Sequence, residues 1–129
     1  MKSFTGNKNA YMDSSFQSLI PLLLPAGLTD YFTLTSHAVD TKQEVIHLYL
    51  EEKNEPPTEL KGDLVSKGFF EEASFQDFPI RGHRVFMHVK RRRWVNKLSG
   101  KVVTRDWDLI AKGTRITKDF AAFLKEISG

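Results

Sequence analysis

Residues 83–96 constrain the fold most, because they read as a single strand of fourteen residues. An extended chain of that length spans roughly 46 Å at about 3.3 Å per residue, well beyond a usual strand. Apolar side chains occupy the odd positions as far as Val89, and arginine replaces them at Arg91 and Arg93. Alternate residues of a strand share one face. We therefore expect the first part of the strand to pack on a core and its end to project as part of a hairpin.

The turn of this hairpin contains Gly100, which suits a left-handed position. If residues 98–100 form a three-residue loop, Arg93 faces Arg105 on a returning strand at residues 102–108. Like charges that face each other destabilise a sheet. This register therefore predicts that solvent or an anion neutralises the two arginines.

A two-residue loop at Ser99 and Gly100 is the alternative. It would pair Arg93 with Asp106 and Trp94 with Arg105, which replaces the repulsion with an ion pair and a cation–π contact. The sequence leaves both registers open.

The remaining pattern predicts an α+β fold. We expect a small antiparallel sheet with a projecting basic β-hairpin, a short N-terminal helix and a C-terminal helix. The expected elements are a helix from Ser14 or Ser15 to Leu24, a helical turn or bridge at residues 28–32, strands at 32–39, 44–51 and 67–76, and a helix at 118–127 capped by Thr117. In the second strand, Ile46, Leu48 and Leu50 should face the core.

The length of 129 residues fits one domain. We expect residues 1–13 to be a flexible N-terminus and residues 14–129 to form the domain. Ten phenylalanines supply a core, and no apolar run reaches the roughly 18 residues of a membrane span. The chain has no cysteine, which excludes disulfides and thiolate metal sites, and no secretory signal is recognisable. These features favour a cytoplasmic protein.

Charge is distributed unevenly along the chain. Residues 81–118 contain twelve Lys or Arg and two acids, whereas the first 80 residues contain six Lys or Arg and twelve acids. The domain therefore divides into an acidic half, 14–80, and a basic half, 81–129. A polyanion such as nucleic acid would be attracted to the basic half.

We expect the basic half to bind DNA through the hairpin and the start of the last helix. A two-stranded ribbon fits the major groove, and its cations can contact phosphates. A hairpin that is merely solvated is the simpler alternative. The candidate DNA-binding residues are Lys90, Arg91, Arg92, Arg93, Trp94, Lys97, Lys101, Arg105, Trp107, Lys112, Arg115 and Lys118.

Other patterns carry less chemistry. The paired acids Glu51-Glu52 and Glu71-Glu72 read as solvated surface residues, because no nucleophile or phosphate-binding loop accompanies them. The four histidines are dispersed and show no metal-ligand spacing. The residues therefore predict no cofactor, no metal and no catalytic site.

The chain resembles the N-terminal region of insertion-sequence transposases of the ISAon type, within the broader ISL group. The resemblance covers nearly the whole chain. Its main pieces are Ser66-Lys67-Gly68-Phe69-Phe70, Gln76-Asp77-Phe78-Pro79-Ile80-Arg81-Gly82, Lys90-Arg91-Arg92-Arg93-Trp94, Arg105-Asp106-Trp107, Ala111-Lys112-Gly113-Thr114-Arg115 and Phe120-Ala121-Ala122-Phe123-Leu124-Lys125-Glu126-Ile127.

In that group, the resemblance implies a zinc ribbon, then a helix-turn-helix, then a DDE catalytic domain. Arg92-Arg93-Trp94 is similar to a motif that continues with a cysteine ligand, but Val95 stands near that position here. The resemblance therefore implies a zinc-ribbon-like fold without metal. The helix at 118–127 is similar to the beginning of the helix-turn-helix.

The resulting hypothesis is an accessory transposase region that binds double-stranded DNA at the element ends and does not itself cut DNA. Catalysis would reside on a separate DDE polypeptide or a lost downstream segment. Two alternatives remain open. The first is a protein–protein adaptor that docks the catalytic subunit, and the second is an RNA-binding module.

Overall fold

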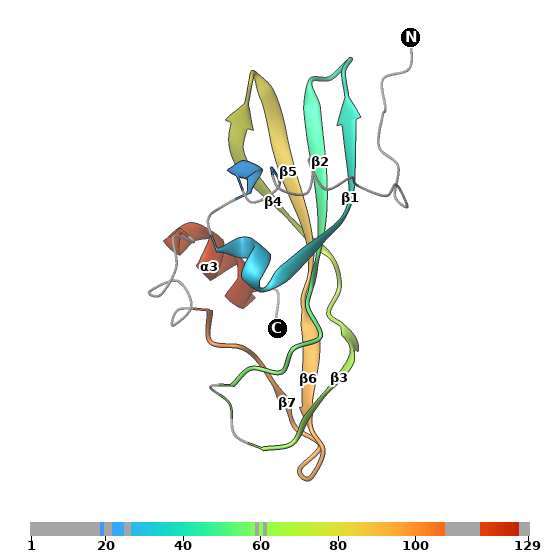
Figure 1. Cartoon of the computed structure of the whole chain (residues 1–129), viewed down its shortest axis with the longest axis vertical. Helices are drawn as coiled ribbons and strands as arrows, with labels where there is room; N and C mark the ends of the chain where they lie inside the picture. The colour runs from blue at the N-terminus through green and yellow to red at the C-terminus, as the bar shows by residue number, and fades with distance from the viewer. Residues whose placement is uncertain are drawn as a thin grey trace.

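A computed structural model describes residues 19, 22–24, 27–58, 60, 62–107 and 117–126. The α+β class is confirmed (Figure 1). The elements are a 3-10 turn η1 (Leu28–Asp30), strands β1 (Phe32–Asp40), β2 (Val45–Glu52), β3 (Leu64–Phe69), β4 (Ala73–Ile80), β5 (His83–Lys90), β6 (Arg92–Asn96) and β7 (Val102–Val103), and helix α3 (Lys118–Glu126).

The strands form two sheets rather than the single sheet expected. Sheet A has the order β1-β2-β5-β4, and sheet B has the order β3-β6-β7. Strands β2 and β5 are parallel, so sheet A is mixed, and the other strand pairs are antiparallel. The sheets lie at opposite ends of an elongated molecule, with the β6–β7 turn at the extreme tip of sheet B (Figure 1).

The long strand at residues 83–96 is confirmed as extended chain, but Arg91 divides it into β5 and β6. Up to this point the buried residues are the odd ones, ending with Val89 and Arg91. Beyond it the alternation changes, because Trp94 is buried and Arg93 is exposed. Arg91 is therefore the residue at which the strand passes from one sheet to the other.

The core lies between sheet A and α3. Leu50, Met87 and Val89 from the sheet belong to one buried cluster with Phe120 and Leu124 of the helix. Thr117 caps the helix as predicted, because its Oγ1 accepts a hydrogen bond of 3.1 Å from the Phe120 N–H. The last residue of the predicted helix, 127, lies outside the described residues.

Two strand predictions are wrong. Residues 67–76 are not one strand, because they span the end of β3, a connection and the start of β4, which belong to different sheets. Gly68 has a φ of +76° within an irregularity of β3, so the strand bends there. The returning strand expected at 102–108 is limited to the two residues of β7.

Neither predicted hairpin register is correct. Trp94 pairs with Val103 and Val95 pairs with Val102, which leaves a four-residue loop at 97–100. The Asn96 side-chain oxygen accepts hydrogen bonds from the Leu98 and Ser99 N–H groups at 2.9 and 3.1 Å. This local bonding is typical of asparagine in turns and stabilises the longer loop.

The N-terminal half follows the predictions more closely. Strands β1 and β2 lie within one residue of their expected bounds, and η1 occupies the predicted helical turn. The expected helix ending at Leu24 lies largely outside the described residues, although Leu22 and Leu23 are helical. Residues 1–13 also lie outside the described residues.

Candidate functional site

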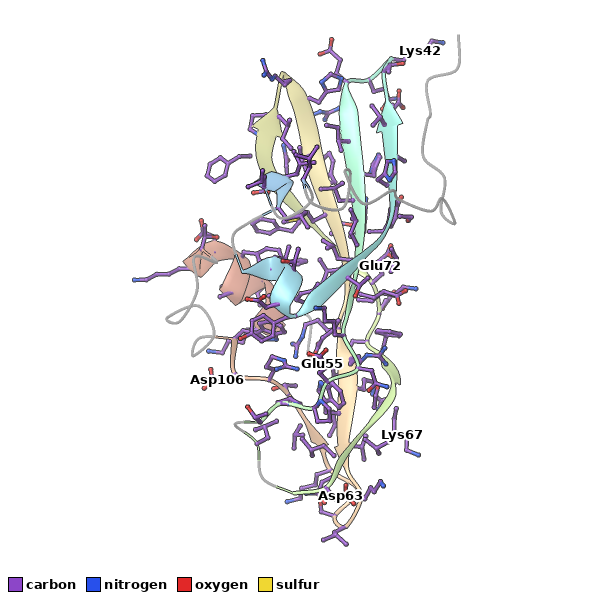
Figure 2. The ribbon with its side chains drawn as sticks, in the orientation of Figure 1. Lys42, Glu55, Asp63, Lys67, Glu72 and Asp106 are labelled. Atoms are coloured by element: carbon purple, nitrogen blue, oxygen red, sulfur yellow. The ribbon has the colours of Figure 1, made fainter. Side chains whose placement is uncertain are left out.

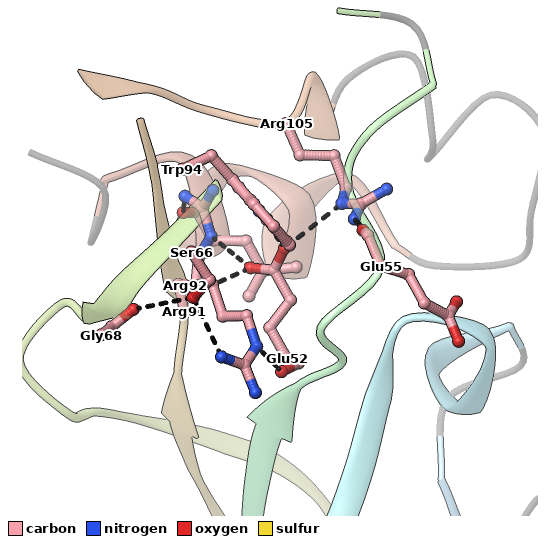
Figure 3. A network of polar contacts seen from close by, with 9 residues as sticks. Glu52, Glu55, Ser66, Gly68, Arg91, Arg92, Trp94 and Arg105 are labelled. Atoms are coloured by element: carbon pink, nitrogen blue, oxygen red, sulfur yellow. Dashed lines mark hydrogen bonds and ion pairs between the residues drawn. The ribbon is translucent and has the colours of Figure 1, made fainter. Parts of the chain in front are cut away.

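A buried carboxylate lies where the two sheets and α3 meet. Glu52 is the last residue of β2 and is only 1% exposed. Its Oε2 accepts a hydrogen bond of 2.9 Å from Trp94 Nε1, and its Oε1 accepts one of 3.1 Å from the Arg92 backbone N–H (Figure 3). The sequence interpretation of Glu52 as a solvated surface acid is therefore wrong.

Two arginines from the predicted DNA-binding set balance this carboxylate. The Nε atoms of Arg91 and Arg105 lie 3.7 and 3.4 Å from the Glu52 carboxylate oxygens. Arg91 is 0% exposed and Arg105 is 8% exposed. Both guanidinium groups face the interior, so neither is available to a phosphate in this structure.

Arg91 also stabilises the end of α3. Its Nη1 donates a hydrogen bond of 2.6 Å to the carbonyl of Leu124, one of the last-turn carbonyls that lack a partner within the helix. A cation at this end also complements the helix dipole. Burial, partly offset by Glu52, lowers the pKa of Arg91 to about 10, so the side chain remains charged at neutral pH.

Arg105 joins the loop after β2 to the same cluster. Its Nη2 donates a hydrogen bond of 2.8 Å to the carbonyl of Glu55. Its guanidinium lies 5.1 Å from the ring centre of Tyr31. Arg105 therefore holds three segments together: the chain after β7, the loop after β2 and the residue after η1.

The two tryptophans are structural in this arrangement. Trp94 is fully buried, and Trp107 is 2% exposed. The ring of Trp107 stacks on Phe32 at 5.5 Å and lies 5.1 Å from the Arg91 guanidinium. Their burial does not fit the prediction that they belong to the DNA-binding residues.

Other predicted residues do reach the surface. Arg93 on β6, Lys97 in the hairpin loop and Lys101 after it are exposed, as is Lys118 at the start of α3. Lys97 forms an ion pair of 3.7 Å with Asp63, whose side chain is itself largely exposed. Lys112 and Arg115 lie outside the described residues.

Two of the predicted cations are half-buried. Lys90 lines a surface hollow of about 310 Å³ that also contains Glu51 and Glu72. Arg92 donates hydrogen bonds to the Glu52 carbonyl and the Ser66 hydroxyl, and it lies over the ring of Phe69 at 4.6 Å. Arg92 therefore connects β6 to both β2 and β3.

Four of the nine exposed Lys and Arg side chains in the described part of the chain lie on sheet B and its hairpin loop. Residues 62–69 and 92–103, which form this sheet and its hairpin loop, contain five Lys or Arg and one acid. One of the five, Lys67 on β3, was not among the predicted site residues, although it is exposed (Figure 2). The basic tip, defined as Lys67, Arg93, Lys97 and Lys101, is the strongest candidate interface for a polyanion.

The sequence did contain a signal for the buried cluster. Glu52 has the same parity as Leu48 and Leu50, and Arg91 has the same parity as Met87 and Val89. Each of these two oppositely charged residues therefore continues the apolar face of its own strand. If the two strands are neighbours in a sheet, this pattern predicts a buried ion pair. Counting charges along the chain conceals this because it ignores the face on which each residue lies.

Comparison with protein-family models, with curated proteins and with solved structures yields no match for this chain. Within the described part of the chain, no group of three or more His, Asp or Glu side chains is placed to hold a metal ion. Nor does any helix in that part have the length and apolar character needed to cross a bilayer.

Proposed function

We propose that this chain is a DNA-binding accessory region of an insertion-sequence transposase and that the basic tip contacts the element ends. The observation that carries the proposal is the excess of cations over acids on the projecting β3–β6–β7 sheet, where four of the cations are exposed. The resemblance of the chain to ISAon-type transposases supplies the biological context. Catalysis would then belong to a separate DDE polypeptide in the same cytoplasmic compartment.

The structure narrows the residues proposed to contact DNA. Arg93 lies on β6, Lys97 begins the four-residue hairpin loop, and Lys101 follows it, so their exposed side chains can reach the phosphates of a duplex. Arg91 and Arg105 position the tip instead, because their guanidinium groups are committed to Glu52. This division predicts that only the exposed set affects the salt dependence of binding.

A duplex titration at several salt concentrations tests the proposal. We expect Arg93→Ala, Lys97→Ala and Lys101→Ala each to reduce the slope of log K against log salt by about 0.9, the value for one lost phosphate contact. The control is Lys42→Ala, because Lys42 is exposed in the β1–β2 turn at the opposite end of the molecule (Figure 2). This variant should leave the slope unchanged.

Absence of duplex binding at about 50 mM salt, where screening is weak, would refute the proposal. Equal effects of Lys42→Ala and Arg93→Ala would show non-specific attraction without a defined interface. Competition with single-stranded RNA distinguishes the RNA-binding alternative, because an RNA-binding tip would release the duplex at low concentrations of RNA.

An exposed apolar surface favours a second candidate function, that of an adaptor. Leu22 and Phe78 are each 78% exposed. Phe78 and Leu23 line a hollow of about 250 Å³ that reaches Phe120. Exposed large apolar side chains that cluster often mark protein–protein contacts. Co-purification with a DDE polypeptide from nuclease-treated lysate, lost in Phe78→Ser, would support the adaptor function.

A further inference from the structure

A chain of hydrogen bonds crosses the face of sheet A that is opposite α3. His47 Nδ1 and His88 Nε2 are 2.8 Å apart, and the Ser74 hydroxyl lies 2.7 Å from His88 Nδ1. These residues come from β2, β5 and β4, and 41 positions separate the two histidines. Sequence spacing could not reveal the contact, because strand pairing alone brings the histidines together.

The two imidazoles meet end to end. Their planes differ by 24° and their centres are 5.1 Å apart. With ring nitrogens only 2.8 Å apart, this centre distance requires the nitrogens to point at each other in nearly one plane. The geometry is that of a direct hydrogen bond in which one ring donates and the other accepts.

The position of this bond within the sheet is distinctive. Sheet A consists of two hairpins, β1–β2 and β4–β5, which meet at the parallel β2–β5 pairing. We call this pairing the seam. His47 and His88 lie on opposite sides of the seam, so their bond ties one hairpin to the other.

The arrangement does not favour nucleophilic catalysis. Ser74, His88 and His47 occur in the order of a nucleophile, a base and an orienting group. However, the hollow beside them is lined by two carboxylates, those of Glu51 and Glu72, and one cation, Lys90, so its net charge would not stabilise a developing oxyanion. The chain of bonds is better suited to holding a proton than to attacking a substrate.

We propose that the His47–His88 hydrogen bond is a pH-sensitive contact that holds the seam closed at neutral pH and releases it in mild acid. A neutral pair satisfies the bond, and so does a pair that carries one extra proton. A second extra proton places N–H groups on both facing nitrogens, so the bond is lost and two like charges repel each other. This inference does not depend on DNA binding.

The surrounding charges are mixed. Tyr49 and Glu51 share the histidine face of β2, Lys90 and Arg84 share it on β5, and Glu72 approaches from the connection before β4. The nearest residues of β1 on this face, Ser36 and Ala38, are neutral. The Glu72 carboxylate therefore stabilises protonated histidines and opposes the release of the seam in acid. The cations Lys90 and Arg84 repel protonated histidines and favour the release.

The direction of the pH effect follows from His88. Burial, with a further contribution from His47, lowers the pKa of His88 below the ordinary value of 6.5, although Glu72 partly opposes the shift. An opened seam restores the ordinary value, so the opened state takes up a proton that the closed state rejects. The closed seam is therefore fully stable above pH 6.5 and loses stability as the pH falls toward the pKa of His88 in the folded protein.

Hydrogen exchange of the backbone amides in residues 45–51 and 84–90 tests the proposal. If opening takes up one proton, the equilibrium constant for opening rises about tenfold for each pH unit of acidification. The protection factors should therefore fall about tenfold per pH unit below pH 6.5. His88→Gln should abolish the slope, because glutamine does not titrate. His47→Gln should only narrow the pH range over which the slope appears, because burial still lowers the pKa of His88 when His47 is absent. The control His83→Gln should retain the slope, since His83 lies on β5 but contacts the Arg81 carbonyl instead.

Three outcomes would overturn the inference. The first is a pH-independent protection of the seam in the unaltered protein. The second is an equal loss of protection in the amides of sheet B, which would indicate global unfolding. The third is titration of His88 at its ordinary pKa of 6.5 in NMR spectra of the unaltered protein, a measurement that requires no variant to fold.

Discussion

Glu52→Gln is expected to lower the free energy of unfolding by about 3–5 kcal/mol, because it leaves two buried arginines without a counter-charge. Glutamine keeps the size of the side chain but has one acceptor oxygen, so its amide group must face one of two donors, Trp94 Nε1 or the Arg92 N–H. The loss therefore reports the charge and this unmatched donor rather than the volume. Urea denaturation followed by circular dichroism measures it, provided that the slope against urea concentration is unchanged.

Glu51→Gln is the matched control. Glu51 precedes Glu52 in β2 but lies on the opposite face, where it lines the surface hollow. We expect a change within about 0.5 kcal/mol for this variant. Equal effects of the two substitutions would show that the buried cluster does not stabilise the fold.

A double-variant cycle identifies the partner. Arg91→Met removes one buried cation, so Glu52→Gln should cost less in that background than in the unaltered protein. The residual cost should reflect Arg105, which keeps its contact with Glu52. Strict additivity would contradict the pairing of Glu52 with Arg91.

Much of the fold could be predicted because apolar alternation is a local property. The alternation of apolar and polar residues alone predicts the extended chain at residues 83–96 and the strands β1 and β2. The capping residue Thr117 predicts the start of α3. The division between two sheets could not be found in this way. Arg91 continues the apolar face of β5, and only the packing of α3 and Glu52 around it shows why the strand changes sheet there.

The candidate site was predicted only in part, for a physical reason. A run of cations predicts a basic surface when all of its members are solvated. Along β5 the odd positions point inward as far as Arg91, and the alternation then changes where the strand enters sheet B. Arg91 is therefore buried, whereas Arg93, which is also at an odd position, is exposed. The hairpin register was missed because the Asn96 side chain stabilises a loop one residue longer than the three-residue loop expected.

Trp94→Ala is the second substitution with a large expected effect. Trp94 is fully buried, so removing its indole leaves a cavity between sheet B and Glu52 and should cost about 3–5 kcal/mol. The same change removes the donor to Glu52 Oε2. Thermal and urea denaturation should both report the loss, and Leu98→Ala is a suitable control because Leu98 is 90% exposed in the nearby hairpin loop.

Trp94→Phe separates packing from hydrogen bonding at this position. Phenylalanine retains most of the apolar ring but cannot donate to Glu52, and Glu52 Oε2 then keeps only its longer contact with Arg105. The cost should be about 1–3 kcal/mol, the range for a lost hydrogen bond to a buried charged group. If Trp94 instead contacted DNA, both variants would weaken duplex binding without changing stability. A loss of stability with an unchanged salt slope would establish that Trp94 supports the basic tip from within, as its burial indicates.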